Sequence, residues 1–315
     1  MVEQGWLGID IPESFGGLEL PPSFSAAFSR ELGRANCVTG YLPAIVVSAS
    51  LVARSGGSSA LLEPVLAGRE TFGTALFEPD RTNHIWDVAA GAEILENGGY
   101  RLNGHKTTVL LATSASAYLV VARLSGRPMD RDGLGLFLVP RNVDGLREYV
   151  YETIDGAHSA DLTLTDVDVA SSACISGNAG DAIDRTFARA LTFAAAEIVG
   201  VVESGFDMTV DYLKQRKQFG QPLIAFQALR HRLVDHLCSL RSIEALSDRM
   251  TVELESGNEE WTNATRRFDY IADRAMRMME DFVQLHGAIG MTQEYRLGAY
   301  FKRVAMLGAM LRQSI

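Results

Sequence analysis

A cation, an aromatic ring and an amide lie at a break between two amphipathic segments, within the stretch Tyr212–His231 (YLKQRKQFGQPLIAFQALRH). The three side chains are Arg216, Phe219 and Gln227, and the break is the Gly-Gln-Pro run that follows Phe219. Proline disfavours helical geometry in the residue before it, so the first helix is expected to stop here. A fixed guanidinium suits a phosphate and a ring suits an adenine. The alternative is a solvated helix end whose phenylalanines lie in the core.

A second candidate is Gln284–Gly290, QLHGAIG. An amide side chain at Gln284, followed by Gly287, would let backbone N–H groups approach a pyrophosphate or a ribose closely. The alternative is a glycine that only ends a helix. Beside the Arg216 stretch, contact with a cofactor is the favoured interpretation.

The elements that must position these side chains fall into three regions, 1–72, 73–176 and 177–315. The first is mostly helical. The second carries alternating and β-branched runs that are split by Asn97-Gly98 and Asn103-Gly104, which indicates an antiparallel β domain with tight turns. The third returns to a helical period and predicts long helices that form a four-helix bundle.

Apolar spacing gives the faces of these helices. Phe24, Phe28 and Leu32 fall on one face of a helix in the first region. In the third region, apolar residues from Ile183 to Phe206 mark one long helix, and its alanines together with Gly200 would allow a close approach to another helix. Further helices are expected around Leu229–Met250, Phe268–Phe282 and Leu297–Leu311.

Composition excludes several classes of function. The chain has 315 residues, 47% of them hydrophobic and 22% charged, which is ordinary for a globular protein with a large core. Its net charge of −10 argues against nucleic acid as a partner. It shows no apolar run of membrane-spanning length (about 18 residues), no signal peptide and no metal-ligand spacing. Its three cysteines are far apart and suggest incidental thiols in a reducing cytoplasm.

The Arg216 stretch resembles the signature R-x-Q-F-G-x-P-[IL]-x-x-F-Q-x-x-x-H of the acyl-CoA dehydrogenases. QLHGAIG resembles that family's Q-x-x-G-G-x-G, with Ala288 in place of the second glycine, and GWLGIDIPESFGGLEL resembles its entry loop. The resemblance covers essentially the whole chain. It implies an α+β fold with an N-terminal helical domain, a middle antiparallel β domain and a C-terminal four-helix bundle. In the family, FAD binds where two subunits meet. The residues that would contact the FAD of a neighbouring subunit are Arg216, Phe219, Gln227, Gln284 and Gly287.

The same comparison implies that the pocket for the chain's own flavin ring is lost. Phe77–Asn83, FEPDRTN, stands where the family has T-E-P-x-A-G-S-D, so a phenyl ring replaces a hydroxyl group. In place of the family's K-x-W-I-T, the chain has KTTVL, with Thr108 for tryptophan and Leu110 for the hydroxyl residue. An apolar ring cannot make the hydrogen bond that the family uses there.

The catalytic carboxylate of the family is also missing. Removal of the α proton of an acyl-CoA needs a base, which the family places at positions that match Ala190–Leu191 or, on the last helix, Leu311. Neither holds a carboxylate, and the chain ends shortly after Leu311. Glu197 follows Ala190 by one heptad, about 10 Å along the helix. It is either a relocated base or, as we favour, a carboxylate hydrogen-bonded between helices.

The leading hypothesis is therefore a non-catalytic subunit of a heteromeric FAD-dependent acyl-CoA dehydrogenase. Its partners would be a homologous catalytic subunit in a heterotetramer, an acyl-CoA substrate and an electron-transfer acceptor. Acyl-CoAs derived from steroids or cholesterol are one candidate class of substrate. Neither nucleic acid nor a membrane is expected as a partner. One alternative is a self-sufficient homo-oligomeric dehydrogenase that uses Glu197 or an unrecognised base. Another is a flavin-free scaffold or acyl-CoA-binding protein.

Overall fold

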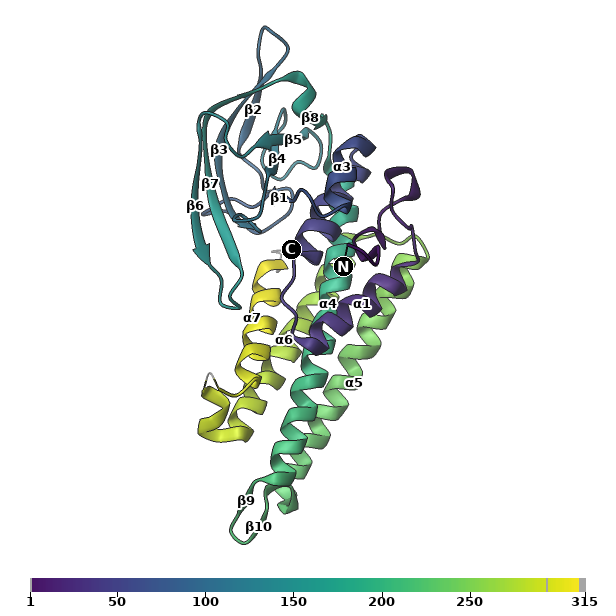
Figure 1. Ribbon diagram of the computed structural model, residues 1–315, viewed down its shortest axis with the longest axis vertical. Helices are drawn as coiled ribbons and strands as arrows, with labels where there is room; N and C mark the ends of the chain where they lie inside the picture. Colours follow the sequence, from purple (N-terminus) through teal and green to yellow (C-terminus); the bar gives the residue numbers. More distant parts are fainter. Residues whose placement is uncertain (1, 293, 312–315) are drawn as a thin grey trace.

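The structure, a computed structural model, describes residues 2–292 and 294–311 (Figure 1). Helices come first, a β-sheet follows, and a bundle of long helices completes the chain, which confirms the predicted α+β fold class. The first region contains η1 (Trp6–Gly8), η2 (Glu13–Phe15), α1 (Pro22–Ala35), η3 (Tyr41–Ala49), α2 (Ser50–Arg54) and α3 (Ser59–Leu66).

The middle region is a mixed sheet in the order β6-β7-β3-β2-β4-β5-β8, with β1 beside β4. Its strands are β1 (Phe72–Ala75), β2 (Gly91–Ile94), β3 (Tyr100–Leu110), β4 (Ala117–Arg123), β5 (Leu134–Pro140), β6 (Leu146–Glu152), β7 (His158–Val169) and, after η4 (Ser171–Ala173), β8 (Cys174–Ser176). Most neighbours are antiparallel, but β1 and β2 both run parallel to β4. Strand β3 lies between β2 and β4 along the chain and provides the long connection that this arrangement needs, because parallel neighbours cannot be joined by a tight turn.

One predicted turn in this sheet is wrong. Asn97-Gly98 does form the turn between β2 and β3, as expected. Asn103-Gly104, however, lies inside β3, opposite a register shift in β7. Gly104 has φ +148, and a Cβ there would lie 2.5 Å from the Cβ of Ala90. The glycine therefore serves a bulge and a close approach to the 76–90 loop.

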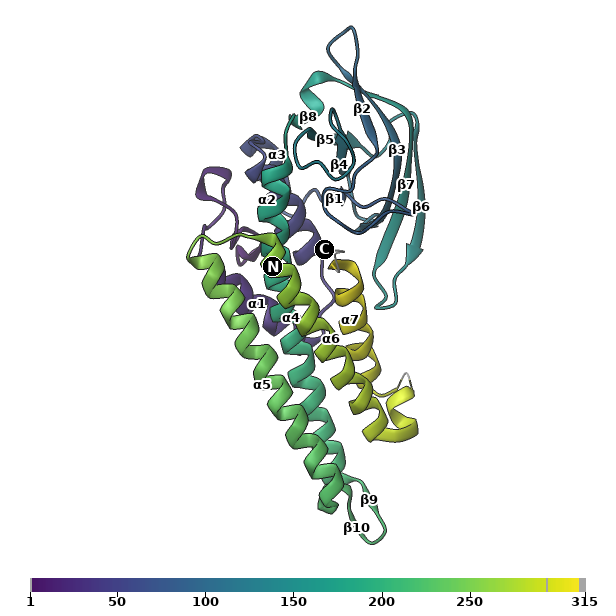
Figure 2. The ribbon, with the colours of Figure 1, turned by 180° about the vertical axis from the view of Figure 1, so that it is seen from behind.

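The last region is built around one central helix (Figures 1 and 2). Its helices are α4 (Gly180–Gln215), α5 (Gln227–Glu255), α6 (Trp261–His286) and α7 (Leu297–Leu311), with β9 (Lys217–Gln218), β10 (Gln221–Pro222), η5 (Leu223–Ala225) and η6 (Gly287–Met291) in the connections. Helix α4 packs against α1, α5, α6 and α7. It is buried on every side from Thr186 to Val202, as expected of a helix that is apolar all round.

Helices α1 and α4 lie unusually close together. A Cβ at Gly200 would lie 2.0 Å from the carbonyl oxygen of Arg30, and one at Gly33 would lie 2.0 Å from that of Glu197. The close approach expected at Gly200 is thus confirmed. The predicted face of α1 is wrong in part, because Phe24 is 54% exposed. Its buried face is formed mainly by small side chains, which this spacing requires: Ser25, Ala26, Ser29, Leu32 and Gly33.

The structure was also searched for membrane-spanning helices and for metal sites. Within the described part of the chain, no helix is both long and apolar enough to cross a bilayer. The same residues contain no group of histidine, cysteine and carboxylate side chains that could hold a metal ion.

Candidate functional site

The Arg216 stretch lies at the far end of the bundle, in the hairpin that projects beyond α4 and α5 (Figure 1). Helix α4 already ends at Gln215, so the predicted stop at the Gly-Gln-Pro run is several residues too late. Gln218 and Gln221 pair across a turn whose central residues, Phe219 and Gly220, have φ +52 and +80. Two positive φ values fit a hairpin turn that matches the twist of its strands.

This turn displays its side chains to solvent. The Phe219 ring is 89% exposed and meets Phe226 edge to face at 6.2 Å. Arg216 is also exposed; its N–H donates to the Tyr212 carbonyl and its carbonyl accepts from Leu223. Among the described residues, no side chain forms an ion pair or hydrogen bond with the Arg216 guanidinium. The geometry leaves a cation and a ring available to another molecule.

The second stretch lies at the same end of the molecule. Gln284 and Gly287 are exposed at the end of α6, and the Gly287 N–H donates to the Gln284 carbonyl. Gly287 has φ +67, with open space where a Cβ would lie. It therefore caps the helix and also leaves its backbone accessible. Leu285 packs with Leu213 of α4 and Leu233 of α5, which brings both stretches together. Gln227, the first residue of α5, is exposed beside the hairpin.

The counterpart of the flavin-ring region lies at the opposite end, between the sheet and the bundle. It encloses a cavity of only about 40 Å³, whereas ligand pockets commonly measure roughly 300–1,000 Å³. The Phe77 and Phe187 rings meet edge to face at 5.9 Å and occupy much of this region. The cavity is lined by Pro43, Val47, Thr74, Leu76, Phe77, Thr108, Leu110, Phe187, Met310 and Leu311. No described carboxylate lines it.

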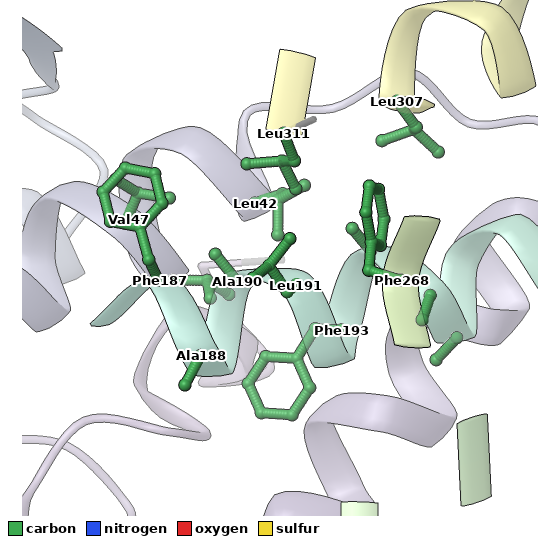
Figure 3. Close-up of a cluster of buried hydrophobic side chains, with 14 of the residues drawn as sticks. Leu42, Val47, Phe187, Ala188, Ala190, Leu191, Phe193, Phe268, Leu307 and Leu311 are labelled. Carbon is green, nitrogen blue, oxygen red and sulfur yellow. The ribbon is translucent and has the colours of Figure 1, made fainter. Parts of the chain in front are cut away.

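Of the positions expected for the base, Leu311 lines this cavity, and Ala190 and Leu191 belong to the same apolar core cluster as Leu311. Figure 3 shows Leu311 of α7 in one cluster with Leu191 and Ala190 of α4 and Leu42 of η3. All of these side chains are apolar and buried. The fold therefore brings the two alignment positions together in space, and neither presents a carboxylate. The residues that follow Leu311 lie outside the described part of the chain.

Two charged residues of the flavin-ring motifs serve a structural purpose. Lys106 Nζ lies 2.7 Å from Glu78 Oε1 and 3.0 Å from the Leu76 carbonyl oxygen. Glu78 also accepts from the N–H groups of Ala89 and Ala90 at 2.9 Å. Burial lowers the pKa of Lys106 to about 8, although Glu78 opposes the shift. This pair anchors the 76–90 loop to β3, which explains why glutamate and lysine are present while the ring-contacting positions have changed.

Glu197 lies in a buried ionic cluster. Arg303 of α7 reaches Glu197 Oε1 through Nη2 at 2.6 Å and through Nε at 2.7 Å. Its Nη1 reaches Oδ2 of Asp155, in the turn between β6 and β7, at 2.7 Å. Burial raises the pKa of Glu197, and Arg303 opposes that shift. A carboxylate held on an arginine between helices matches the structural interpretation of Glu197 better than a free base.

Sequence reasoning missed the residues that complete these contacts. Arg303 was assigned no partner, because Glu197 and Asp155 are far from it in sequence. No sequence pattern singles out Trp86, yet its indole donates to Asp184 of α4 at 2.7 Å and ties the 76–90 loop to the bundle. Tyr212 and His286 stack on each other between the two exposed stretches. A tyrosine in the first stretch and a histidine in the second were visible, but no pattern indicated that they meet.

Comparison of the sequence with models of protein families shows which family the chain belongs to. The acyl-CoA dehydrogenase N-terminal domain matches residues 1–66, and the acyl-CoA dehydrogenase C-terminal domain matches residues 178–310. The chain belongs to the acyl-CoA dehydrogenase family. This family is FAD-dependent, and its members are oxidoreductases.

Relatives of this acyl-CoA dehydrogenase homologue cover most of its length. It is 26% identical to a 3-(aryl)acrylate reductase of Clostridium sporogenes, over 98% of this chain and 84% of the relative. It is also 26% identical to an acyl-CoA dehydrogenase of Bacillus subtilis, over 94% of this chain and 80% of the relative. A solved structure named as a Tcur3481-Tcur3483 steroid ACAD variant matches with a TM-score of 0.86 and 27% identity, over 99% of this chain and 83% of the other.

The two ends of the molecule differ in how well they fit FAD. The apolar cavity around Phe77 and Phe187, at about 40 Å³, is far smaller than the roughly 300–1,000 Å³ of common ligand pockets, so it does not fit an isoalloxazine ring. The exposed end has groups of the right chemistry for the other half of the cofactor: an Arg216 guanidinium that no described side chain binds, the exposed ring of Phe219 and the exposed backbone of Gly287. Guanidinium groups bind phosphate in a bidentate manner, and rings stack on bases.

Proposed function

We propose that this chain is the non-catalytic subunit of a heteromeric FAD-dependent acyl-CoA dehydrogenase. In a heterotetramer, its Arg216, Phe219, Gln227, Gln284 and Gly287 contact the adenosine diphosphate half of FAD held by a homologous catalytic subunit. The complex would introduce an α,β double bond into an acyl-CoA, and FAD, when bound, would supply the hydride-accepting chemistry at the β carbon. The partner supplies the base that removes the α proton.

One contrast carries this proposal. The region where the chain would hold its own flavin ring and base leaves a cavity of only about 40 Å³, which is lined mainly by apolar side chains. The surface that would hold a neighbour's cofactor is exposed, and no described side chain binds its Arg216 guanidinium. A self-sufficient enzyme needs both regions, and a scaffold needs neither. Exposed groups for a neighbour's cofactor, together with a small apolar cavity in the chain's own flavin-ring region, favour a subunit that serves a partner.

The substrate and the remaining partners belong to the same proposal. The similar structure named as a steroid ACAD supports a steroid-derived acyl-CoA as the substrate class. The two electrons removed from the acyl chain must leave the complex, so the complex needs an electron-transfer protein as acceptor. We place the complex in the cytoplasm.

The self-sufficient alternative has weaker support. It needs a base close to an acyl chain, and the only carboxylate suggested for that role, Glu197, is held by Arg303. The flavin-free alternative predicts a complex without FAD, and the experiment on Arg216 detects this outcome directly.

Replacement of Arg216 by alanine tests the proposal. The chain is co-produced with each full-length homologue of its source organism, and the FAD content of the purified complex is measured by its absorbance. We expect Arg216→Ala to lower FAD affinity by at least about tenfold, the size of one lost charged hydrogen bond. The matched control is Arg266→Ala, because Arg266 is exposed on the second turn of α6, toward the other end of the bundle. Unchanged flavin content in the Arg216 variant, or no complex with any homologue, contradicts the proposal.

A further inference from the structure

The two exposed stretches are connected inside the bundle by a pair of stacked rings. The Tyr212 and His286 rings lie 4.5 Å apart with an interplanar angle of 26°. Tyr212 is one helical turn before Arg216 and accepts its N–H at 2.8 Å. His286 lies directly before Gly287. Each ring is therefore rigidly attached to one half of the exposed surface.

Hydrogen bonds fix the orientation of His286. The side chain is 3% exposed, and its Nδ1 lies 2.7 Å from the Phe282 carbonyl oxygen. A carbonyl oxygen can only accept, so Nδ1 carries the hydrogen. Burial lowers the pKa of His286, with the carbonyl groups of Phe282 and Met208 opposing the shift, so the ring is neutral near pH 7. Its Nε2 then accepts from the Tyr295 hydroxyl at 3.2 Å.

Arg232 and His236 join α5 to α6 through Asp281, but among the described residues the directional side-chain contact that joins the α4 end to the α6 end is the one at His286. Leu213, Leu233 and Leu285 pack together beneath them, but apolar contacts resist separation more than rotation. The imidazole is held by a bond at each nitrogen and by a ring on its face. Rotation of the α6 end relative to α4 would break these contacts, and it would change the spacing between Arg216 and Gly287.

We propose that His286 is a positioning residue, which sets the orientation of the Gln284–Gly287 turn relative to Arg216. The inference rests on the proposed function, because the surface that it orders is the one that holds the partner's FAD. His286 contacts no cofactor in this account. Tyr212 and Tyr295 act with it as the stacking ring and the hydroxyl donor.

The test uses His286→Phe in the complex with the catalytic homologue. Phenylalanine keeps a ring against Tyr212 but loses both hydrogen bonds. We expect the dissociation constant for FAD, measured by fluorescence titration of the flavin-free complex, to rise about tenfold, the effect of one or two lost bonds. Tyr295→Phe removes a hydroxyl group only and should give a smaller rise, about threefold, with an unchanged melting temperature. The control is His84→Phe, because His84 is also buried but packs against Trp86 and Trp261; it should leave FAD affinity unchanged.

A double substitution separates positioning from general destabilisation. If His286 acts by orienting the turn toward Arg216, then adding His286→Phe to Arg216→Ala should weaken FAD binding less than twofold further. Fully additive effects overturn the inference, as does wild-type FAD affinity in His286→Phe when Arg216→Ala has weakened it. If Arg216→Ala itself has no effect, the proposed function fails first and this inference fails with it.

Discussion

Glu197 joins three parts of the molecule through Arg303. The arginine belongs to α7, Glu197 to α4 and Asp155 to the β6–β7 turn, and all three side chains are buried. Two carboxylates on one guanidinium form a cross-link between the bundle and the sheet. This arrangement gives Glu197 a structural role and removes it from consideration as a free base in our account.

Glu197→Gln is expected to change stability and leave catalysis unaffected. The amide keeps the shape of the side chain but loses a charge-assisted bond, so the free energy of unfolding should fall by about 1–3 kcal/mol. Turnover of a steroid-derived acyl-CoA by the complex, followed with ferrocenium as acceptor, should stay within twofold of the wild type. Chemical denaturation and steady-state kinetics provide the two measurements.

The control for this substitution lies on the same helix. Glu203 also accepts from an arginine, Arg30, and Glu203→Gln should show a comparable loss of stability with unchanged turnover. Loss of turnover in Glu197→Gln alone would identify Glu197 as the base. From the sequence, the residue type and helix of Glu197 could be predicted, but its partner could not, because that contact depends on how α7 and the β6–β7 turn come together.

At the scale of elements, the contact between α1 and α4 depends on glycine. Gly200 lies where the α1 backbone passes, with the Arg30 carbonyl oxygen 2.0 Å from the position of a Cβ. Backbone atoms cannot move aside as a flexible side chain can. The two helices would have to separate to admit even one methyl group.

Gly200→Ala should therefore destabilise the protein, against the usual preference of helices for alanine. Overpacking of this kind costs about 1–3 kcal/mol or more. Gly308→Ala is the matched control, because Gly308 also lies within a helix but has only an ordinary contact, 3.6 Å from the Cβ of Ala272. That variant should be neutral or more stable by up to about 1 kcal/mol. Equal denaturation midpoints for the two variants would refute the close packing.

The spacing of apolar residues predicted most helices and strands of this fold, but it did not predict the buried face of α1 or the conformation at Asn103-Gly104. The apolar residues chosen for α6, such as Phe268, Met279 and Phe282, are all buried. The face of α1 was misjudged because large apolar residues were given more weight than the small ones that permit close packing. Asn103-Gly104 resembled a turn, yet sheet pairing with β7 keeps it extended, since tertiary contacts override local turn preference.

At the scale of the whole molecule, the two candidate regions lie at opposite ends. Phe77, Phe187 and Leu311 line a cavity of only about 40 Å³ where the sheet meets the bundle. The hairpin of β9 and β10 projects beyond the far end of α4 and α5 (Figure 1), and its Phe219 ring is exposed. The sequence predicted the residues of both regions through the family resemblance. It could not predict the convergence of Leu191 and Leu311, or the stack of Tyr212 on His286, because each joins helices that are far apart along the chain.

The central claim is that this chain has no flavin of its own and completes the site of a partner. The most direct measurement is the visible absorbance spectrum and native mass of the chain purified alone and then with its catalytic homologue. We predict a colourless protein alone and a yellow heterotetramer with one FAD for each pair of chains. A yellow homo-oligomer of this chain by itself would contradict the account.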